Sequence, residues 1–252
     1  MIIVDLTSGF GNQLFQYAAG VAFKLAKGRE LYLNSSRGNL HSNRDYREFF
    51  TSSIFKEDIT QGNVWNTKLN AFGSWNPNMH LPPRVILRGY FQYLPPLVQI
   101  MHVLRTSVLD QLKAKYNSPE ILKGAFIHVR RGDYLDPQYK LPVQTKEYFE
   151  NGMAYIESKT PITQWIMVSD DIKWCKEQDW SNKNIIIFEE EDEVKVFYYM
   201  VHWSEGAVIS NSTFGWWAAM FGAHKEGSPV VYPKIWHLEK KPKLFPNEWV
   251  AL

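Results

Sequence analysis

Short apolar runs alternate with helical segments through the second half of the chain, and this alternation constrains the fold more than any other feature. The runs predict strands at residues 125–129, 165–168, 185–188, 207–209 and 230–232. Between them, helices are predicted at residues 146–157, 193–203 and 214–221, with a further helix after Asp171. Strands that alternate with helices in this way predict an α/β fold with a mostly parallel sheet.

The first half of the chain opens with a second pattern of the same kind. Residues 2–6 are apolar, a glycine turn follows, and apolar residues then recur at helical spacing before a strand that ends at Asn34. Residues 35–81 are polar and predict long loops with short helices, residues 85–87 predict a strand, and residues 94–116 predict one helix with two prolines in its first turn.

The pattern resets near residue 118, and 252 residues are enough for two small domains. We therefore expect two Rossmann-like domains, at residues 1–118 and 119–252, each with a mostly parallel sheet. The tail from Pro233, which contains two further prolines, is expected to wrap back over the surface.

Charge and cysteine content exclude several classes of partner. With 28 basic and 26 acidic residues the net charge is only +2, so nothing predicts nucleic-acid binding. The single cysteine, Cys175, excludes an internal disulfide and a multi-cysteine metal site.

No apolar stretch approaches the roughly 18 residues of a membrane span, and no signal peptide is visible. The expected location is therefore the cytoplasm, with peripheral attachment to the inner membrane as a variant.

The strand at residues 125–129 runs directly into the sequence Arg130-Arg131-Gly132-Asp133. Because side chains alternate along a strand, His128 and Arg130 should share one face. An arginine at the end of a buried strand suits phosphate or carboxylate oxygens, and Asp133 could orient its guanidinium. A structural salt bridge between an arginine and Asp133 explains the same residues equally well.

Two other turns carry chemistry at strand ends. Gly9, Gly11 and Asn12 lie where the first strand meets the first helix, a place where backbone can approach a ligand closely. A dinucleotide fingerprint would need a third glycine at Leu14 and an acid at Asn34, and both are absent. An ordinary tight turn remains the alternative.

The other turn is Ser210-Asn211-Ser212-Thr213, which precedes an apolar helix that starts near Phe214. One helix cap needs fewer polar residues than this, and the surplus hydroxyls and amides could seat a phosphate. Trp216 and Trp217, which follow at helical spacing, are predicted to be core.

Two acidic sequences are not interpreted as metal sites. Asp170 and Asp171 point in different directions and have no histidine or third acid nearby, so we interpret them as helix cap and dipole partners, or as a nucleotide contact. The run at residues 189–193 is interpreted as a solvated helix entrance. No metal site is predicted.

The three motifs, which begin at Gly9, His128 and Ser210 and follow one another in that order along the chain, together resemble those of the bacterial α-1,2-fucosyltransferases of glycosyltransferase family 11. The resemblance spans residues 9–219 and rests on three sequences: Gly-Phe-Gly-Asn-Gln-Leu-Phe-Gln-Tyr-Ala from Gly9, His-Val-Arg-Arg-Gly-Asp from His128, and Ser-Asn-Ser-Thr-Phe-Gly-Trp-Trp-Ala-Ala from Ser210.

The resemblance implies a GT-B arrangement with a cleft between an acceptor-side N-terminal domain and a C-terminal domain that binds the donor, GDP-β-L-fucose. It implies inverting transfer of L-fucose to the 2-hydroxyl of a terminal β-galactoside, such as a galactose-containing oligosaccharide or glycan, without a metal or other cofactor. By the same analogy Arg130, Asn12 and Asp133 form the catalytic set. The implied donor-binding set is Gly9, Gly11, His128, Arg130, Ser210, Asn211, Ser212, Thr213 and Phe214.

The chain departs from the family pattern in two ways. The family commonly carries an acidic residue just ahead of the helix that precedes the Ser/Thr motif, whereas the acids of this chain lie earlier, at Asp192 and Glu193. The chain is also short for the family, so its acceptor loops are expected to be trimmed. Two alternatives stay open: a non-catalytic protein that binds a GDP-sugar or a glycan, and a glycosyltransferase that uses another nucleotide sugar.

Overall fold

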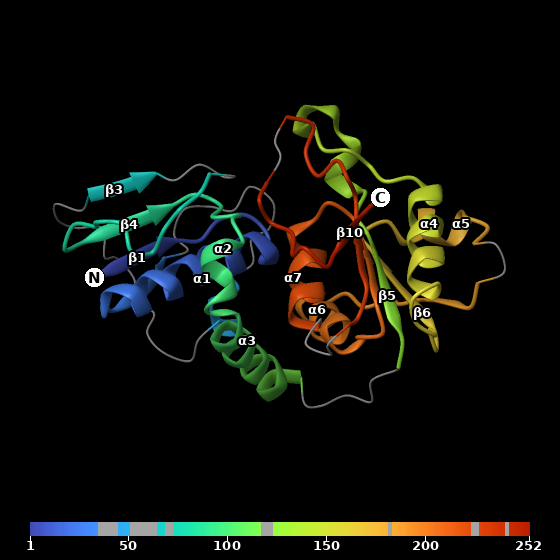
Figure 1. Ribbon diagram of the computed structural model, residues 1–252, viewed down its shortest axis with the longest axis horizontal. Helices are drawn as coiled ribbons and strands as arrows, with labels where there is room; N and C mark the ends of the chain where they lie inside the picture. The colour runs from blue at the N-terminus through green and yellow to red at the C-terminus, as the bar shows by residue number, and fades with distance from the viewer. Residues whose placement is uncertain are drawn as a thin grey trace. The chain divides into compact units, whose positions relative to one another are not determined.

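The computed structural model describes residues 1–34, 45–50, 65–68, 73–116, 123–180, 183–222, 227–239 and 242–252, with backbone alone at 65–68 (Figure 1). The chain divides into two compact units. Unit 1 holds Met1–Asn117 and Pro242–Leu244, and unit 2 holds Ser118–Lys241 and Phe245–Leu252. The predicted domain boundary at residues 118 and 119 lies outside the described residues.

Unit 1 contains a four-stranded parallel sheet in the order β2-β1-β4-β3. Its strands are β1 (Ile2–Asp5), β2 (Leu31–Asn34), β3 (Trp65–Lys68) and β4 (Val85–Arg88). Strand β3 corrects the prediction of loops and short helices for residues 35–81. Its sequence, Trp-Asn-Thr-Lys, lacks the apolar run of a buried strand, as suits a strand at the edge of a sheet. A short 3₁₀ helix at Arg47–Phe49 is the only helix in the part of that segment that the structure describes.

Helix α1 (Phe10–Lys27) connects β1 to β2 and packs closely on the sheet. A Cβ atom at Gly20 would lie 2.7 Å from a Leu31 methyl and 2.8 Å from a Val4 methyl, so a larger residue would force these side chains to shift. The helix ends at Gly28, whose φ of 61° is left-handed and whose N–H donates to the Lys24 carbonyl.

The predicted helix at residues 94–116 is two helices, α2 (Pro95–Val98) and α3 (Met101–Tyr116). The break lies at Gln99 and Ile100, where the Ile100 N–H donates to the Leu97 carbonyl three residues back instead of four. Hydrophobic spacing alone does not reveal such a tightened turn.

Unit 2 contains a six-stranded parallel sheet in the order β10-β9-β8-β5-β6-β7. Its strands are β5 (Ala125–Val129), β6 (Trp165–Ser169), β7 (Ile185–Ile187), β8 (Ala207–Ile209), β9 (Val230–Tyr232) and β10 (Val250–Ala251). The connecting helices are α4 (Lys146–Glu157), α5 (Ile172–Glu177), α6 (Glu193–His202) and α7 (Thr213–Gly222), and two short 3₁₀ helices at Gly132–Leu135 and Pro137–Tyr139 follow β5.

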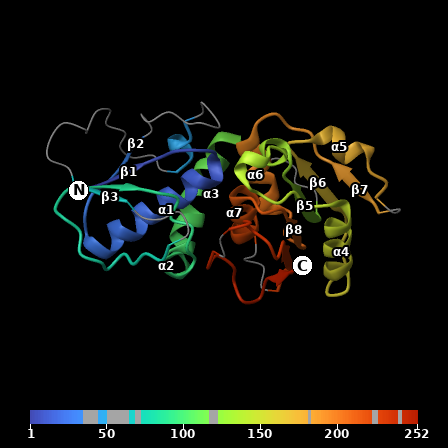
Figure 2. The same ribbon diagram turned by 90° about the horizontal axis from the view of Figure 1, so that it is seen from above.

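Helices cover both faces of this sheet, with α4 and α5 on one side and α6 and α7 on the other (Figures 1 and 2). Ile127 and Val129 pack with α4 and α5, in a core that includes Phe149 and Met153. On the α7 side, Trp216 and Trp217 are fully buried, which confirms their prediction as core residues. Strand β5 is therefore buried on both faces, and its carboxyl end is the place where its residues can become accessible.

The C-terminal tail adds a strand that the sequence did not predict. Strand β10 pairs in parallel with β9, and the tail also buries Leu244 and Trp249. Two residues of strand after a proline-containing segment give no periodic signal. Among the described residues no helix is long and apolar enough to cross a membrane.

Candidate functional site at the carboxyl ends of β5, β6 and β8

Three neighbouring strands of unit 2 end in polar residues at the same edge of the sheet. β5 leads into Arg130, β6 into Asp170 and β8 into Ser210. The parallel register pairs Val129 of β5 with Ser169 of β6, so the next residues along each strand emerge side by side. Ligand sites of open α/β sheets lie at this edge.

Arg130 lies between two carboxylates. Its Nη2 donates to Asp133 Oδ1 at 2.5 Å, and its Nη1 lies 3.0 Å from Asp170 Oδ2. Burial lowers the pKa of the guanidinium, but the two carboxylates outweigh burial and raise it overall, so the charge is permanent. The first contact is a hydrogen bond and the second an ion pair, and the side chain of Arg130 is 34% exposed. The salt bridge and an open cationic face therefore coexist in one residue.

Asp170 and Asp171 divide the roles that the sequence assigned to them jointly. Asp171 caps α5, because its Oδ1 accepts the Trp174 N–H at 3.0 Å, and its Oδ2 accepts from Arg131 Nε at 3.1 Å. Asp170 does not cap the helix: besides its contact with Arg130, its Oδ1 accepts the Arg131 N–H at 2.9 Å. The predicted helix cap is Asp171, and the predicted contact with a nucleotide stays a prediction.

His128 is buried on the α7 side of β5, with 6% of its surface exposed. Its ring lies 5.7 Å from the Phe214 ring, and a Cβ atom at Gly215 would lie 2.7 Å from its Nδ1. Burial, together with the charge of Arg130, lowers the pKa of the imidazole to about 3, so the ring is neutral at physiological pH. No described group forms a hydrogen bond with Nδ1.

We expect the neutral state of His128 to make folding stability depend on pH. Its folded pKa of about 3 lies below the ordinary 6.5, so the stabilisation is complete above pH 6.5 and is lost as the pH falls toward 3. His128→Gln removes this titration while the carboxylates stay common to both proteins. The loss of unfolding free energy between pH 7 and pH 5, measured with urea, should be smaller in the variant by about 2 kcal/mol. Equal losses in both proteins would contradict the assignment.

The polar turn after β8 is mostly engaged within the protein. Ser210 is fully buried, and its Oγ accepts the Arg130 N–H at 3.0 Å. Asn211 is also buried: its Nδ2 donates to the Trp236 carbonyl at 3.1 Å, and its Oδ1 accepts from Gln144 at 3.2 Å. These hydrogen bonds hold the turn in place, and the contribution of the two side chains to a phosphate site stays a prediction.

Ser212 and Thr213 mark the start of α7. Ser212 Oγ accepts the Phe214 N–H at 3.3 Å, as in a helix cap. Thr213 and Phe214 are half-buried, whereas Ser210, Asn211 and Ser212 are buried, so these two are the more exposed residues of this cluster.

Tyr134 links the cluster around Arg130 to the turn at residues 210–213. This residue was not identified from the sequence. Its hydroxyl donates to the Asn211 carbonyl at 2.9 Å, and its ring centroid lies 5.5 Å from the Arg130 guanidinium carbon. Burial raises the pKa of this phenol, so the hydroxyl stays protonated and can donate. A tyrosine one residue after Asp133 was the available signal, but its partner lies 77 residues away in sequence.

The glycine-rich cluster Gly9, Gly11 and Asn12 lies in unit 1, at the carboxyl end of β1. Gly9 caps α1 with a φ of −75°, and nothing lies within 4 Å of a Cβ atom placed there, so the fold itself does not require glycine at this position. Gly11 is buried in the first turn of the helix. Asn12 is half-buried, and its Oδ1 accepts from Gln92 Nε2 at 3.0 Å.

Two buried glutamines brace the loop before α1. Gln13 Nε2 donates to the Ser8 carbonyl at 2.8 Å, and Gln16 forms hydrogen bonds with both the N–H and the hydroxyl of Thr7. Ser8 has a left-handed φ of 67°, a conformation that costs a non-glycine residue energy and that these bonds help to hold. The structure thus gathers His128, Arg130, Asp133 and residues 210–214 in unit 2, and Gly9, Gly11 and Asn12 in unit 1.

Comparisons with known proteins match nearly the whole chain to glycosyltransferases. The family model described as Glycosyl transferase family 11 matches residues 1–252. In Escherichia coli, O-antigen biosynthesis glycosyltransferase WbnK is 26% identical, with 98% of this chain and 99% of the relative covered, and alpha-1,2-colitosyltransferase is 25% identical, with 100% and 99% covered. Galactoside alpha-(1,2)-fucosyltransferase 1 of Plecturocebus brunneus is 25% identical, with 96% and 72% covered.

A solved structure shows the same fold. The crystal structure of NodZ alpha-1,6-fucosyltransferase soaked with GDP-fucose matches 93% of this chain and 95% of its own, with a TM-score of 0.51 and 12% sequence identity. The α/β class with two Rossmann-like parallel sheets is thereby confirmed.

Proposed function

The chain belongs to glycosyltransferase family 11, and from that premise we propose that it transfers L-fucose from GDP-β-L-fucose to the 2-hydroxyl of a terminal β-galactoside, with inversion of the anomeric centre. The observation that carries this proposal is Arg130: a permanently charged guanidinium at the end of the central strand β5, oriented by Asp133 and Asp170. Galactoside fucosyltransferases among the relatives, and a fucosyltransferase among the solved structures, support fucose as the sugar.

The chemistry needs a site that stabilises departing GDP. As the glycosyl phosphate bond breaks, negative charge grows on the diphosphate, and fixed cationic and N–H groups stabilise it most when they are already in place. Arg130 supplies the charge, and the first N–H groups of α7, near Thr213 and Phe214, supply the positive end of a helix. Neutral His128 would contact the nucleoside side of the donor.

Asp133 and Asp170 act in this proposal as positioning residues, and neither acts as the base. Each carboxylate is bound to Arg130, and Asp170 also binds the Arg131 N–H. A loose transition state with positive charge on the sugar lets the acceptor hydroxyl lose its proton late, so a strong base is not required. Asn12, fixed by Gln92, would position the acceptor or the fucose.

The test is to incubate the protein with GDP-β-L-fucose and a panel of β-galactosides and to determine the product linkage and anomeric configuration by NMR. An α-1,2-fucoside supports the proposal. Hydrolysis or binding of the donor without transfer to any galactoside would favour a binding protein.

A related donor is the second candidate. The alpha-1,2-colitosyltransferase resembles this chain as closely as the galactoside fucosyltransferases do, and over its whole length. An activated colitose should therefore be offered in competition with GDP-fucose. A larger kcat/KM for the colitose donor would show that colitose, and not fucose, is the preferred sugar.

We expect transfer to continue in the presence of a chelator. Arg130 and the start of α7 can neutralise the charge on GDP, the task that a divalent ion performs in metal-dependent transferases. Initial rates with excess EDTA should match those of the untreated enzyme within about twofold, a change of less than about 0.5 kcal/mol in the barrier. Loss of activity that Mn²⁺ or Mg²⁺ restores would show that a metal takes part.

A further inference from the structure

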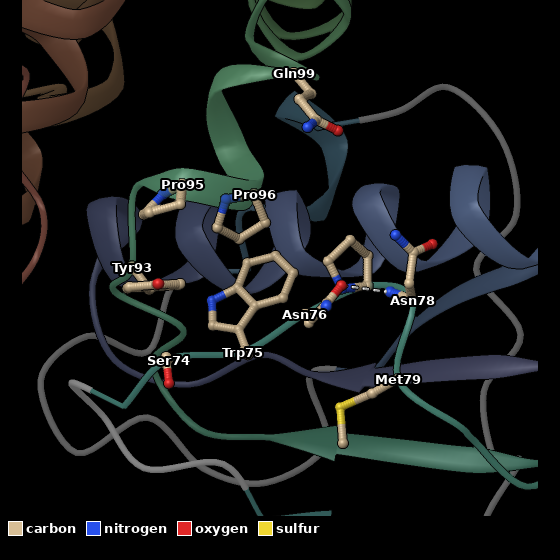
Figure 3. A pocket seen from close by; sticks show the side chains of 10 residues that line it. Ser74, Trp75, Asn76, Asn78, Met79, Tyr93, Pro95, Pro96 and Gln99 are labelled. Carbon is tan, nitrogen blue, oxygen red and sulfur yellow. Dashed lines mark hydrogen bonds between the residues drawn. The ribbon is translucent and has the colours of Figure 1, made fainter.

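A pocket lies in unit 1, lined by residues outside the clusters that the sequence singled out. Its volume is about 520 Å³, and Figure 3 shows its lining: residues 74–79 on one side, and Tyr93, Pro95, Pro96 and Gln99 on the other. This volume falls within the range of small-ligand pockets.

Trp75 gives the pocket a fixed floor. Its ring is 5% exposed, stacks on Phe23 at 5.5 Å and meets the Phe91 ring edge-on at 6.0 Å. The indole N–H donates to the Phe91 carbonyl at 3.2 Å. Phe91 itself has a φ of 55°, a strained conformation for an aromatic residue, and such strain gathers at ligand sites.

Hydrogen bonds also hold residues 76–78, on the same side of the pocket as Trp75, in place. Asn76 Oδ1 accepts the Asn78 N–H at 2.9 Å, the dashed line of Figure 3. Lys27, in the last turn of α1, donates from Nζ to the Asn78 carbonyl at 2.9 Å. The backbone of this side is thus anchored to α1, while the exposed Asn78 side chain remains on the surface of the pocket.

The lining has the chemistry of a neutral sugar site. All ten lining residues are described, and none carries a charge, so the pocket offers no ion pair to a phosphate or carboxylate. It combines the rings of Tyr93, Pro95 and Pro96 with the side-chain amides of Asn78 and Gln99. The flat aromatic ring of Tyr93 suits the C–H face of a pyranose, the two proline rings add apolar surface beside it, and amides can both donate to and accept from sugar hydroxyls.

The pocket is connected to Asn12 through one short segment, residues 89–94. Gln92 binds Asn12, Tyr90 lies 3.2 Å from Ser8 Oγ through its hydroxyl, and Tyr93, the next residue along, lines the pocket. The same segment is fixed at its far end, where the Leu94 N–H donates to the Lys243 carbonyl at 2.9 Å. The residue next to the partner of Asn12 thus lines the pocket, and one braced segment contributes to both.

We propose that this pocket binds a neutral sugar residue of the acceptor glycan, one or more residues away from the galactose that is modified. The proposal rests on the proposed function, because it assigns the acceptor of that reaction. It makes the enzyme select oligosaccharide acceptors over single galactosides.

The test uses two matched tryptophan variants in and beside the pocket. Gln99→Trp places an indole in the pocket from an exposed position, whereas Val98→Trp adds the same ring at a neighbouring residue that is 59% exposed and does not line it. Gln99→Trp should raise KM for a neutral tetrasaccharide acceptor about tenfold and leave KM for a simple β-galactoside and for GDP-fucose unchanged. Val98→Trp should match the wild type with all three.

Equal effects of the two variants, or equal effects on long and short acceptors, would overturn the proposal. A wild-type enzyme with the same kcat/KM for both acceptors would overturn it too. Saturation-transfer NMR with the tetrasaccharide separates this failure from failure of the proposed function. If the protein transfers fucose to no galactoside, the wild type should still bind the tetrasaccharide and Gln99→Trp should not, which would support a sugar pocket. Absence of binding in the wild type would refute the pocket.

Discussion

Replacing Arg130 by alanine is expected to lower kcat about 10³-fold, the effect of removing a preorganised group that stabilises transition-state charge. The loss has two sources. The cation that meets the departing diphosphate disappears. Asp133 and Asp170, which it held at 2.5 and 3.0 Å, lose their cationic partner and leave two negative charges beside the same diphosphate. The fold should survive, because all three side chains are partly exposed and such ion pairs contribute about 1 kcal/mol or less each.

Three measurements check this expectation: steady-state kinetics with GDP-fucose, thermal unfolding, and the Arg130→Lys variant. Lysine keeps the charge but is a single point donor that cannot bind two carboxylates and a diphosphate at once, so its kcat should lie between those of wild type and alanine. An alanine variant with normal stability and retained turnover would remove Arg130 from the mechanism.

The central strands of unit 2 could be predicted from the sequence because they are buried and therefore form continuous apolar runs. β5, β8 and β9 lie where the apolar runs place them, and α4 begins and ends as predicted. β3 and β10 could not be predicted, because an edge strand and a strand of two residues need no apolar run. The division between α2 and α3 depends on a single tightened turn at Ile100.

The site divides in the same way between local and distant contacts. Asp133 lies three residues after Arg130, so the sequence alone indicated that contact. Asp170 is distant in sequence and meets Arg130 only because β6 lies beside β5 in the register that pairs Val129 with Ser169. Tyr134 and Gln92 were missed for the same reason, since their partners come from other loops.

The contact between Arg130 and Asp170 gives the second large expected effect. Asp170→Asn keeps an oxygen that can accept the Arg131 N–H but removes the charge that holds Arg130 Nη1. A guanidinium that is free to move by about 1 Å should lower kcat/KM for GDP-fucose about 10- to 100-fold, with KM for the galactoside unchanged. Gly132→Ala tests the same contact without changing a charge, because its Cβ atom would lie 2.4 Å from Asp170 Oδ2 and must displace that carboxylate.

The adjacent aspartate supplies the matched control. Asp171→Asn removes the ion pair with Arg131 but keeps an amide oxygen that caps α5 as well as a carboxylate does, so kinetics with both substrates should stay within about twofold of wild type. A purely structural role for Asp170 predicts instead that activity falls in step with the melting temperature in all three variants. Equal losses in Asp170→Asn and Asp171→Asn, or a loss in Asp170→Asn that affects the galactoside KM as much as the donor KM, would show that Asp170 does not position Arg130 for the leaving group.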